Sequence, residues 1–485
     1  MPDTLWTDDR LRTDLYIDGA WVPSSDGARF VVENPADETV LASVASATVE
    51  DGQTALDAAD RAFGPWAARP ARERAEVLRK CWELMTQRLD DFARLITLEN
   101  GKAGADARGE AAYAAEFFRW FSEEAVRGEG MISRGPSTGA RMIVQHRPAG
   151  IAVLVTPWNY PAAMGTRKIA PALAAGCPVI IKPASATPLT MLALMDVLEE
   201  AGVPPGLVNV LPSRNTGPLV DKLLHDPRVR VVSFTGSTPV GRTLLRTAAD
   251  QVLKPAMELG GNAPVIICDD ADLGVAVQGV MLAKMRNLGE ACTAANRIYV
   301  QSGIAEAFTA AFTDAMRALK LGDGLDATVD VGPLVNADTR DKVAAFVTDA
   351  ITKGARCVLG GSVPDGPGYF YPPTVLADVP DSADCMGDEI FGPVAAIQTF
   401  SDIESAVAKA NYTEYGLVGY VFTKDLKKGM AISERLDFGM IGLNRGLVSD
   451  PAAPFGGMKQ SGLGREGSHE GMLEFMETQY IATDW

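Results

Sequence analysis

The feature that most constrains the fold is the alternation of short apolar segments with helical ones between about residues 141 and 236. The segments "IAVLVTP", "CPVIIKP", "LVNVLP" and "VRVVSFTG" are typical of buried strands, whereas "RKIAPALAAG" and "LTMLALMDVLEEAG" have the character of helices. A second alternating region begins near residue 262 with the strand "APVIICDD" and a helix through "LGVAVQGVMLAKMRN". This alternation predicts an α/β fold in which helices cover both faces of parallel sheets.

The flanking segments predict further elements. The segment "LYIDGAWV" indicates two short strands joined by an Asp-Gly turn, and residues from about 48 to 125 have helical apolar spacing. The tail "GMLEFMETQYIATDW" is expected to be a strand docked on another element or on another subunit. A chain of 485 residues is long enough for two or three domains.

The composition argues against several classes of protein. A net charge of −17 disfavours a nucleic-acid or anionic-membrane partner. No apolar run reaches the roughly 18 residues that span a bilayer, and the polar, acidic N-terminus does not resemble a signal peptide. We therefore expect a cytoplasmic protein. The six cysteines are scattered and do not stand at zinc-ligand spacing with the three histidines, so neither a disulfide framework nor a metal site is expected.

A dinucleotide site is suggested by "VVSFTGSTPVGRTLL". A strand runs into Gly236 and Ser237 and then into a helix with Gly241 in its first turn, which lets a pyrophosphate approach the helix N-terminus. An ordinary strand-turn-helix is equally consistent with this segment. Lys182 ends a strand, where it can meet a ribose or a phosphate or be a surface charge. The literal GxGxxG motif at 462–467 opens no βαβ unit and is interpreted as a turn or loop.

Three residues are candidates for chemistry. Cys292, in "GEACTAANR", lies among small and polar residues, so it is either a nucleophile or an inert buried thiol. Glu258 lies in an apolar segment before two glycines, where burial raises the pKa of a carboxyl towards the range of a base; a capping or ion-pair role is the alternative. Asn159 follows a strand and can donate to an oxyanion or form a turn.

Taken in order, seven segments resemble the aldehyde dehydrogenase superfamily from about residue 15 to 480. They are "TPWNYP", "KPAS", "FTGSTPVG", "MELGGNAP", "GEACTAANR", "DEIFGPV" and "PFGGMKQSGLGREG". The resemblance implies a doubly wound NAD(P)-binding domain, an α/β catalytic domain and a β extension that pairs subunits in a homodimer or homotetramer. The corresponding ranges are 1–125 with 144–257, 258–440, and 126–143 with 458–485.

The resemblance also implies a mechanism. The thiolate of Cys292 attacks the aldehyde, and the Asn159 side chain and the Cys292 backbone N–H stabilise the oxyanion. Hydride transfer to the nicotinamide leaves a thioester, and Glu258 activates the water that releases a carboxylic acid. No histidine adjoins the cysteine, so a carboxylate base and the cationic nicotinamide must activate a thiol whose ordinary pKa is about 8.5. All three residues are present, which disfavours a non-catalytic relative that only binds the cofactor.

The cofactor implied by the resemblance is NADP, with NAD as the alternative. Many NAD-using relatives carry Glu where this chain has Ser185, and serine removes the repulsion of a 2′-phosphate and leaves Lys182 to meet it. The residues that match cofactor-binding positions of the superfamily are Thr156, Pro157, Trp158, Lys182, Ser185, Gly236, Ser237, Gly241, Glu389 and Phe391.

Within the superfamily, the chain is most similar to the succinate-semialdehyde dehydrogenase branch. Arg167, Arg286 and Ser449 match residues that bind the substrate's far carboxylate, which suits the bidentate fork of a guanidinium. A structural ion pair is the alternative for each arginine. Glu290, where that branch often has Gln, and Arg445 depart from the pattern. The expected reaction is therefore NAD(P)-dependent oxidation of succinate semialdehyde to succinate; glutarate semialdehyde or a broad range of aliphatic aldehydes is the alternative.

Overall fold

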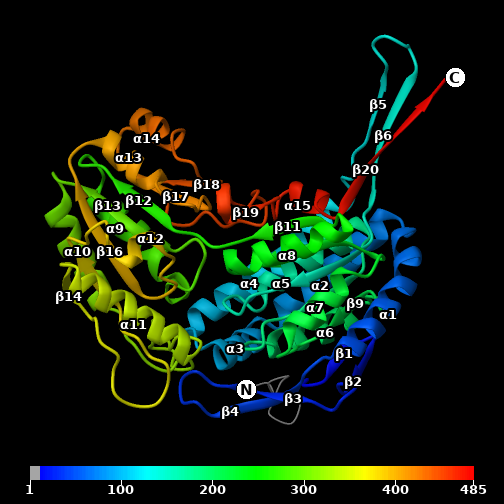
Figure 1. Cartoon of the computed structure of the whole chain (residues 1–485), viewed down its shortest axis with the longest axis horizontal. Helices are drawn as coiled ribbons and strands as arrows, with labels where there is room; N and C mark the ends of the chain where they lie inside the picture. Colours follow the sequence, from blue (N-terminus) through cyan, green and yellow to red (C-terminus); the bar gives the residue numbers. More distant parts are fainter. Residues whose placement is uncertain (1–10, 485) are drawn as a thin grey trace.

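The computed structural model describes residues 11–484, and most of the acidic N-terminal stretch discussed above lies outside that range. Two large sheets, each with its own helices, form two lobes joined side by side, and a three-stranded arm projects from one of them (Figure 1). The α/β class and the doubly wound arrangement are confirmed.

The first sheet belongs to the lobe from which the arm projects. Its strands, in spatial order, are β19 (Gly462–Leu463), β11 (Lys254–Glu258), β10 (Val229–Thr235), β7 (Ile151–Val155), β8 (Val179–Lys182), β9 (Val208–Val210), β1 (Leu15–Ile17) and β2 (Ala20–Val22). The five strands from β11 to β9 are parallel, and the short strands at both edges are antiparallel. Every residue of β7 and β8 is buried, as expected for apolar strands covered on both faces.

The order of this sheet reverses between β7 and β10. The chain passes from β7 to β8 and β9 on one side and then returns to β10 and β11 on the other. The crevice beyond the carboxyl ends of strands at such a switch point is where open α/β sheets bind ligands. We therefore expect a ligand site at the segments that follow β7, β8 and β10.

Helices cover the first sheet and confirm the predicted helical regions. They are α1 (Val49–Ala67), α2 (Ala71–Gln87), α3 (Leu89–Asn100), α4 (Gly104–Glu124), α5 (Ala163–Ala175), α6 (Leu189–Glu200), α7 (Thr216–Leu224) and α8 (Thr238–Gln251). Helix α1 begins with a reciprocal capping box between Thr48 and Asp51, which satisfies otherwise unpaired N–H groups. The predicted Asp-Gly turn between β1 and β2 is confirmed, with positive φ at Asp18 and Gly19.

The second sheet forms the core of the other lobe. Its strands, in spatial order, are β14 (Arg356–Leu359), β15 (Thr374–Ala377), β16 (Val394–Phe400), β13 (Ala295–Gln301), β12 (Ala263–Ile267), β17 (Val418–Phe422) and β18 (Met440–Leu443). All except β14 run parallel to their neighbours. Its helices are α9 (Leu273–Met285), the 3₁₀ segment η1 (Arg286–Gly289), α10 (Ala305–Arg317), α11 (Ala337–Thr352), α12 (Asp384–Gly387), α13 (Ile403–Asn411) and α14 (Leu426–Ser433). The prediction that the α9 helix continues to Asn287 was wrong by two residues, because the backbone turns left-handed there.

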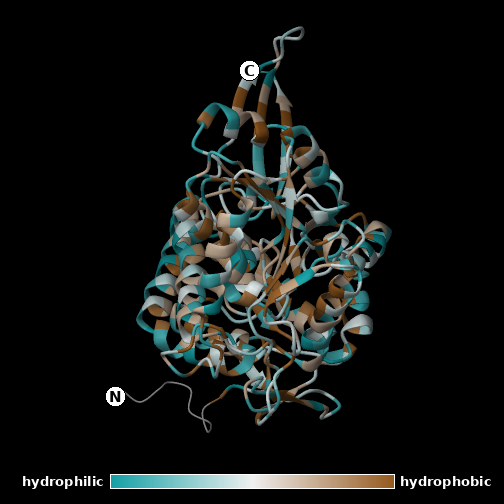
Figure 2. Cartoon of the chain, turned by 90° about the vertical axis from the view of Figure 1, so that its left-hand side faces the viewer, coloured by the Kyte–Doolittle hydropathy of each residue, from teal (hydrophilic) through white to brown (hydrophobic). Residues whose placement is uncertain are grey.

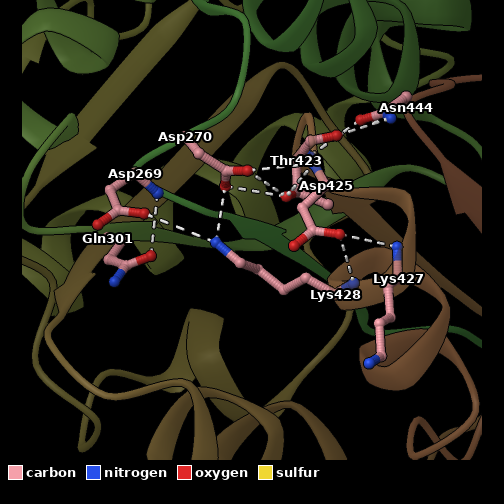
Figure 3. Close-up of polar contacts among 8 residues, drawn as sticks. All are labelled: Asp269, Asp270, Gln301, Thr423, Asp425, Lys427, Lys428 and Asn444. Atoms are coloured by element: carbon pink, nitrogen blue, oxygen red, sulfur yellow. Dashed lines mark hydrogen bonds and ion pairs between the residues drawn. The ribbon is translucent and has the colours of Figure 1, made fainter.

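A polar network ties the ends of β12 and β17 to helix α14 (Figure 3). The Asp270 carboxylate accepts hydrogen bonds from the Thr423 hydroxyl, at 2.8 and 2.9 Å, and from the Lys428 ammonium at 3.0 Å. Asp425 caps the first turn of α14, and Asn444 exchanges hydrogen bonds with the backbone of Thr423. These groups satisfy one another, so this network fixes the carboxyl edge of the second sheet around β12 and β17.

The projecting arm consists of β5 (Met131–Arg134), β6 (Arg141–Pro148) and β20 (Met476–Thr483). The tail therefore forms the predicted strand, and it docks on β6 of its own chain. The remaining elements are β3 (Arg29–Glu33), β4 (Val40–Ala45), the 3₁₀ segment η2 (Lys459–Ser461) and α15 (Glu470–Leu473). We propose the predicted domain boundaries with two refinements, since β19 pairs in the first sheet and β18 extends to Leu443.

The described residues were compared with the requirements of a membrane-spanning helix, a metal site and a disulfide. Within residues 11–484, no helix is both long and apolar enough to span a bilayer. The same residues contain no group of three or more His, Cys, Asp or Glu side chains arranged to hold a metal ion. The six cysteines, all in the described part of the chain, are free thiols.

Candidate active site

A cavity of about 240 Å³ lies between the two lobes, lined by segments that follow β7, β10 and β11 and by segments that precede β13 and β16. The predicted site residues that line it are Pro157, Trp158, Asn159, Arg167, Gly236, Ser237, Arg286, Cys292, Glu389, Phe391 and Ser449. The fold therefore brings together residues from both alternating regions of the sequence. Thr156, Lys182, Ser185, Gly241 and Glu258 lie outside this lining and are described below.

Cys292 lies in the turn before β13, with its side chain half-buried and surrounded by protein atoms. Burial, and then the carboxylates of Glu389 and Glu258, raise the pKa of its thiol to about 12. The thiol of the free protein is therefore protonated near neutral pH, and its use as a nucleophile requires a base or a positive charge. A Cβ atom at Gly261 would lie 2.3 Å from the carbonyl oxygen of Cys292, so only glycine permits this close approach.

Asn159 is joined to the cysteine loop by side-chain hydrogen bonds. Its amide donates to the carbonyl oxygen of Glu290 at 2.9 Å, which leaves its second N–H for another acceptor. The amide of Asn287 donates to the same carbonyl at 2.9 Å and to the carbonyl of Asn159 at 3.1 Å. Asn287, Leu288 and Gly289 have φ values of 56°, 55° and 77°, so three successive left-handed residues turn the chain towards Cys292. Asparagine tolerates this conformation better than most residues.

Two buried side chains, Lys102 and Glu110, hold the backbone around Asn159. The Lys102 ammonium donates to the Asn159 carbonyl at 2.7 Å and to the Glu110 carboxylate at 2.5 Å. The other oxygen of Glu110 accepts the N–H groups of Ala162 and Ala163, at 2.8 and 3.3 Å, where α5 begins. Such supporting contacts hold a donor in one orientation. Sequence reasoning missed Lys102, Glu110 and Asn287, because no short motif marks contacts between such distant segments.

We expect Asn287→Ala to lower both stability and turnover. Alanine in the left-handed backbone lowers the free energy of unfolding by about 1–2 kcal/mol, because it has a Cβ atom but no side-chain amide to form local hydrogen bonds. The loss of two buried hydrogen bonds lowers it by about 1 kcal/mol each. Asn287→Gly keeps the backbone conformation and loses only the hydrogen bonds, so it should unfold at higher denaturant than the alanine variant. Turnover should fall about tenfold or more in both, because the Asn159 amide is less firmly oriented. Denaturant unfolding and steady-state kinetics test this, and equal wild-type turnover in both variants would contradict it.

Glu258 is the last residue of β11 and is buried between β10 and β19. Among the described residues, its Oε2 atom has no hydrogen-bond partner. Burial, and then repulsion by Glu466, raise the pKa of Glu258 well above its usual value. Glu258 lies outside the cavity lining but close enough to Cys292 to raise the pKa of that thiol, and its own raised pKa suits a general base.

Glu466 completes a buried charged cluster that sequence reasoning missed. Its two carboxylate oxygens lie 2.6 Å from Nε of Arg167 and 2.5 Å from Nζ of Lys168. Although burial opposes it, these two cations lower the pKa of Glu466, which therefore stays ionised. Glu466 belongs to the literal GxGxxG segment, which forms the edge strand β19 and the loop after it. That segment opens no helix, so the interpretation as a turn or loop was right except for the short strand.

The predicted cofactor residues other than Glu389 and Phe391 lie at or near the carboxyl edge of the first sheet. Thr156, Lys182 and Gly236 follow or end β7, β8 and β10, on both sides of the switch point. The Lys182 side chain is buried, its pKa is lowered to about 8 by burial, and it forms no ion pair within the described part of the chain. Ser185 is half-buried in the loop after β8.

The N-terminus of α8 faces this edge. Ser237 precedes the helix and makes no side-chain capping hydrogen bond, so it leaves the N–H groups of Thr238 and Val240 to an anion; Pro239 between them has no N–H. A Cβ atom at Gly241 would lie 2.3 Å from the Leu259 side chain, which shows that Gly241 serves close packing of α8. A buried lysine and an uncapped helix N-terminus fit the phosphates of a dinucleotide.

Glu389 and Phe391 close the cavity on the side of the second lobe. The Glu389 carboxylate accepts the N–H of Gly261 at 3.1 Å, and burial raises its pKa to about 7. Phe391 has a φ of 58°, and its ring meets that of Trp158 edge-on with centroids 5.3 Å apart. Phe391 of the second lobe and Trp158 of the first therefore meet at the lining of the cavity.

The two arginines differ in their partners. Nε of Arg167 pairs with Glu466, so the ion-pair alternative holds for that atom, whereas its Nη2 has no hydrogen-bond partner in the described chain. Arg286 forms no direct ion pair with any described carboxylate and lies between the rings of Tyr113 and Tyr160. Both guanidinium groups line the cavity together with Ser449.

Arg445 and Glu290, the two residues that depart from the succinate-semialdehyde dehydrogenase pattern, lie outside the cavity lining. Arg445 is exposed and donates to the carbonyl of Leu447 at 2.7 Å. Glu290 is buried, accepts the N–H of Val335 at 3.3 Å, and has a pKa raised by burial to about 8. Neither side chain belongs to the cavity lining.

Comparisons with known proteins agree with this geometry. Residues 21–481 match the model of the aldehyde dehydrogenase family. The chain is 53% identical, over 91% of its length and 98% of the relative's, to succinate-semialdehyde dehydrogenase of Paenarthrobacter nicotinovorans. It is 45% identical, over 97% of both chains, to glutarate-semialdehyde dehydrogenase of Pseudomonas aeruginosa. The crystal structure of an NADP-dependent enzyme of E. coli superposes with a TM-score of 0.97 at 44% identity, over 99% of both chains.

Proposed function

The chain belongs to the aldehyde dehydrogenase family, and from this premise we propose that it oxidises succinate semialdehyde to succinate with NADP as the hydride acceptor. The observation that carries the proposal is the pair of guanidinium groups in the same cavity as Cys292. Within residues 11–484, Nη2 of Arg167 has no hydrogen-bond partner and Arg286 forms no ion pair. A carboxylate at one end of the substrate satisfies these donors while the aldehyde at the other end meets the thiol. The relatives named above support this substrate class.

In the proposed reaction, the Cys292 thiol gives up its proton to solvent under the positive charge of the bound nicotinamide, and its sulfur bonds to the aldehyde carbon. The free N–H of the Asn159 amide and the backbone N–H of Cys292 donate to the resulting oxyanion. A bound nicotinamide nucleotide supplies the hydride acceptor, and the oxidised substrate remains on Cys292 as a thioester. Glu258, as a carboxylate, then takes a proton from water, whose oxygen attacks the acyl carbon. It passes that proton to the sulfur as succinate leaves, which restores the Cys292 thiol.

Lys182, Ser185 and the N-terminus of α8 are proposed to hold the adenosine phosphates. Glu389 and Phe391 are proposed to hold the nicotinamide ribose and ring, with Thr156, Pro157 and Trp158 facing them from the first lobe. The absence of a carboxylate at Ser185, beside a lysine that lacks an ion-pair partner among the described residues, favours the 2′-phosphate of NADP over NAD.

We expect Ser185→Glu to reverse the cofactor preference. The added carboxylate repels the 2′-phosphate of NADP at a cost of several kcal/mol, so kcat/KM with NADP should fall about tenfold or more. NAD has no 2′-phosphate, so kcat/KM with NAD should stay the same or rise. Ser185→Ala is the matched control, since it removes the hydroxyl without adding charge and should keep NADP preferred. Initial rates with both nucleotides measure the ratio, and an unchanged ratio in the glutamate variant would refute the assignment.

The same site accommodates a second candidate substrate, glutarate semialdehyde. A further cavity of about 270 Å³ adjoins the first and shares Arg286 and Ser449 with it, which leaves room for a longer ω-oxo acid. The relative from Pseudomonas aeruginosa supports this alternative. A broad preference for aliphatic aldehydes would leave the two guanidinium groups without a function in binding.

The projecting arm supports an oligomer, a homodimer or homotetramer. Hydrophobic residues occur along its strands, which carry brown segments in Figure 2. Met131 is 53% exposed, Ile132 69% and Tyr480 57%, because an arm of three strands cannot bury these side chains by itself. We propose that a second copy of the chain covers these residues. Sedimentation velocity tests this: a monomer at micromolar concentration would overturn it.

Steady-state rates with succinate semialdehyde, glutarate semialdehyde and butanal test the proposed function. We expect kcat/KM for succinate semialdehyde to exceed that for butanal, its uncharged counterpart, by about tenfold or more, because hydrogen bonds to a charged group contribute about 1.5–3 kcal/mol each. Equal or faster oxidation of butanal would contradict the carboxylate site. A higher rate with glutarate semialdehyde would select the second candidate.

A further inference from the structure

Two neighbouring cavities share four lining side chains, which together are called the neck. The cavity that contains Cys292 and the adjoining one, which extends towards Asp106 and Glu110, share Tyr113, Tyr160, Arg286 and Ser449. A substrate that spans from Cys292 to the neck therefore places its far end among these four polar side chains. The proposed function assigns Arg286 and Ser449 to that end and leaves both tyrosines without a role.

Both tyrosine hydroxyls are buried and lack a hydrogen-bond partner within the described chain. A buried hydroxyl without a partner costs free energy, so its persistence needs an explanation. The Arg286 guanidinium carbon lies 5.7 Å from the ring centroid of Tyr113 and 5.4 Å from that of Tyr160, so the two rings flank it. The rings fix the guanidinium and keep the two hydroxyls near the neck.

Tyr113 is distinguished from Tyr160 by its charged surroundings. Burial raises the pKa of Tyr113, and the positive charges of Arg167 and Arg286 oppose that rise. The negative charges of Glu466 and of a Cys292 thiolate add to the rise to a smaller extent, so the hydroxyl stays protonated in the field of two guanidinium groups. Tyr160 senses Arg286 but also the carboxylates of Asp106 and Glu110, which repel an anion. The position between two cations is the one that a carboxylate takes up.

Helix α4 sets this position. Tyr113 and Phe117 lie one turn apart on α4, with their rings packed edge-on at 4.9 Å, and Phe117 in turn lies 5.5 Å from the Arg167 guanidinium carbon. The same face of α4 therefore aims an aromatic ring at each arginine. Tyr113 adds a hydroxyl to that face where phenylalanine would fill the space equally well.

We infer that the Tyr113 hydroxyl is a specificity-determining donor to the substrate's far carboxylate, together with Arg286 and Nη2 of Arg167. This inference rests on the proposed function, because it assumes a substrate that carries a carboxylate. It predicts that Tyr113 acts on the choice between acidic and uncharged aldehydes and not on the chemical step at Cys292.

Tyr113→Phe tests the inference, since it removes the hydroxyl and keeps the ring between α4 and Arg286. We expect KM for succinate semialdehyde to rise about tenfold or more, as for the loss of one hydrogen bond to a charged group, with kcat and the kinetics of butanal within about twofold of wild type. Tyr371→Phe is the matched control. Its hydroxyl is also buried but lies in the core of the second lobe, away from both cavities.

The outcomes separate this inference from the proposed function. A wild type that prefers the acid, together with a Tyr113→Phe variant that keeps the same preference, overturns the inference and leaves the proposed function standing. A parallel loss of activity on both aldehydes also overturns it, because the hydroxyl would then be structural. A wild type that does not prefer the acid overturns both. Turnover of butanal by the variant shows that it is folded.

Discussion

Cys292→Ser is expected to lower NADP-dependent oxidation of succinate semialdehyde by roughly 10³-fold or more. The substitution keeps the size of the side chain but replaces the thiol by an alcohol, which ionises far less readily at any pH that the protein tolerates. The polar supports of the loop, the Asn287 and Asn159 amides bonded to the Glu290 carbonyl, involve no atom of the cysteine side chain. The loss should therefore appear in turnover and leave stability within about 1 kcal/mol of wild type.

Cys357→Ser is the matched control for this variant. Cys357 is also a half-buried thiol, but its sulfur contacts the carbonyl of Leu359 at 3.4 Å in the second lobe, outside the cavity. The dehydrogenase activity of the Cys357→Ser variant should equal that of wild type. Substantial dehydrogenase activity in Cys292→Ser, or an equal loss in Cys357→Ser, would contradict the role of Cys292 as the nucleophile.

Glu258→Gln is expected to separate the two halves of the reaction. Glutamine fills the same space but cannot accept a proton, so hydrolysis of the thioester should slow by about 10²–10⁴-fold, the usual contribution of a general base. If the first half persists, rapid mixing should reveal a burst of reduced nucleotide that matches the amount of enzyme, followed by near arrest. No burst and no steady rate would mean that Glu258 is also needed to deprotonate Cys292.

The pH profile provides a second check on Glu258. Because burial raises its pKa, the basic form of Glu258 is lost as pH falls, and wild-type turnover should decline on the acidic side at a higher pH than for an exposed carboxylate. The glutamine variant should lack this limb. An acidic limb that is unchanged in the variant would assign it to another group.

Much of the fold could be predicted, because the central strands are continuous apolar runs bounded by breakers. The strands β7, β8 and β10 and the helices α5 and α6 fall in the predicted segments, since full burial leaves little choice of residue. The left-handed turn at Asn287 could not be predicted, because local helical spacing continues through it and only contacts with Asn159 and Asp106 stop the helix.

The site was predictable where its chemistry lies in short motifs and not where it depends on distant contacts. Cys292, Asn159 and Glu389 follow from local segments, and the structure places them around one cavity. The pairing of Lys168 with Glu466 joins positions 298 residues apart, so no local pattern announces it. The same reason hid Tyr113, whose importance depends on the arginines that α5 and the Cys292 loop place beside it.

Mass spectrometry of the Glu258→Gln variant, mixed with succinate semialdehyde and NADP, shows whether the reaction passes through Cys292. We expect the variant to gain the mass of one succinyl group on the peptide that contains Cys292, and hydroxylamine to remove it as expected for a thioester. Omission of NADP should prevent the gain. A burst of reduced nucleotide without a succinyl group on Cys292, or the same gain in a Cys292→Ser background, would contradict a reaction through this cysteine.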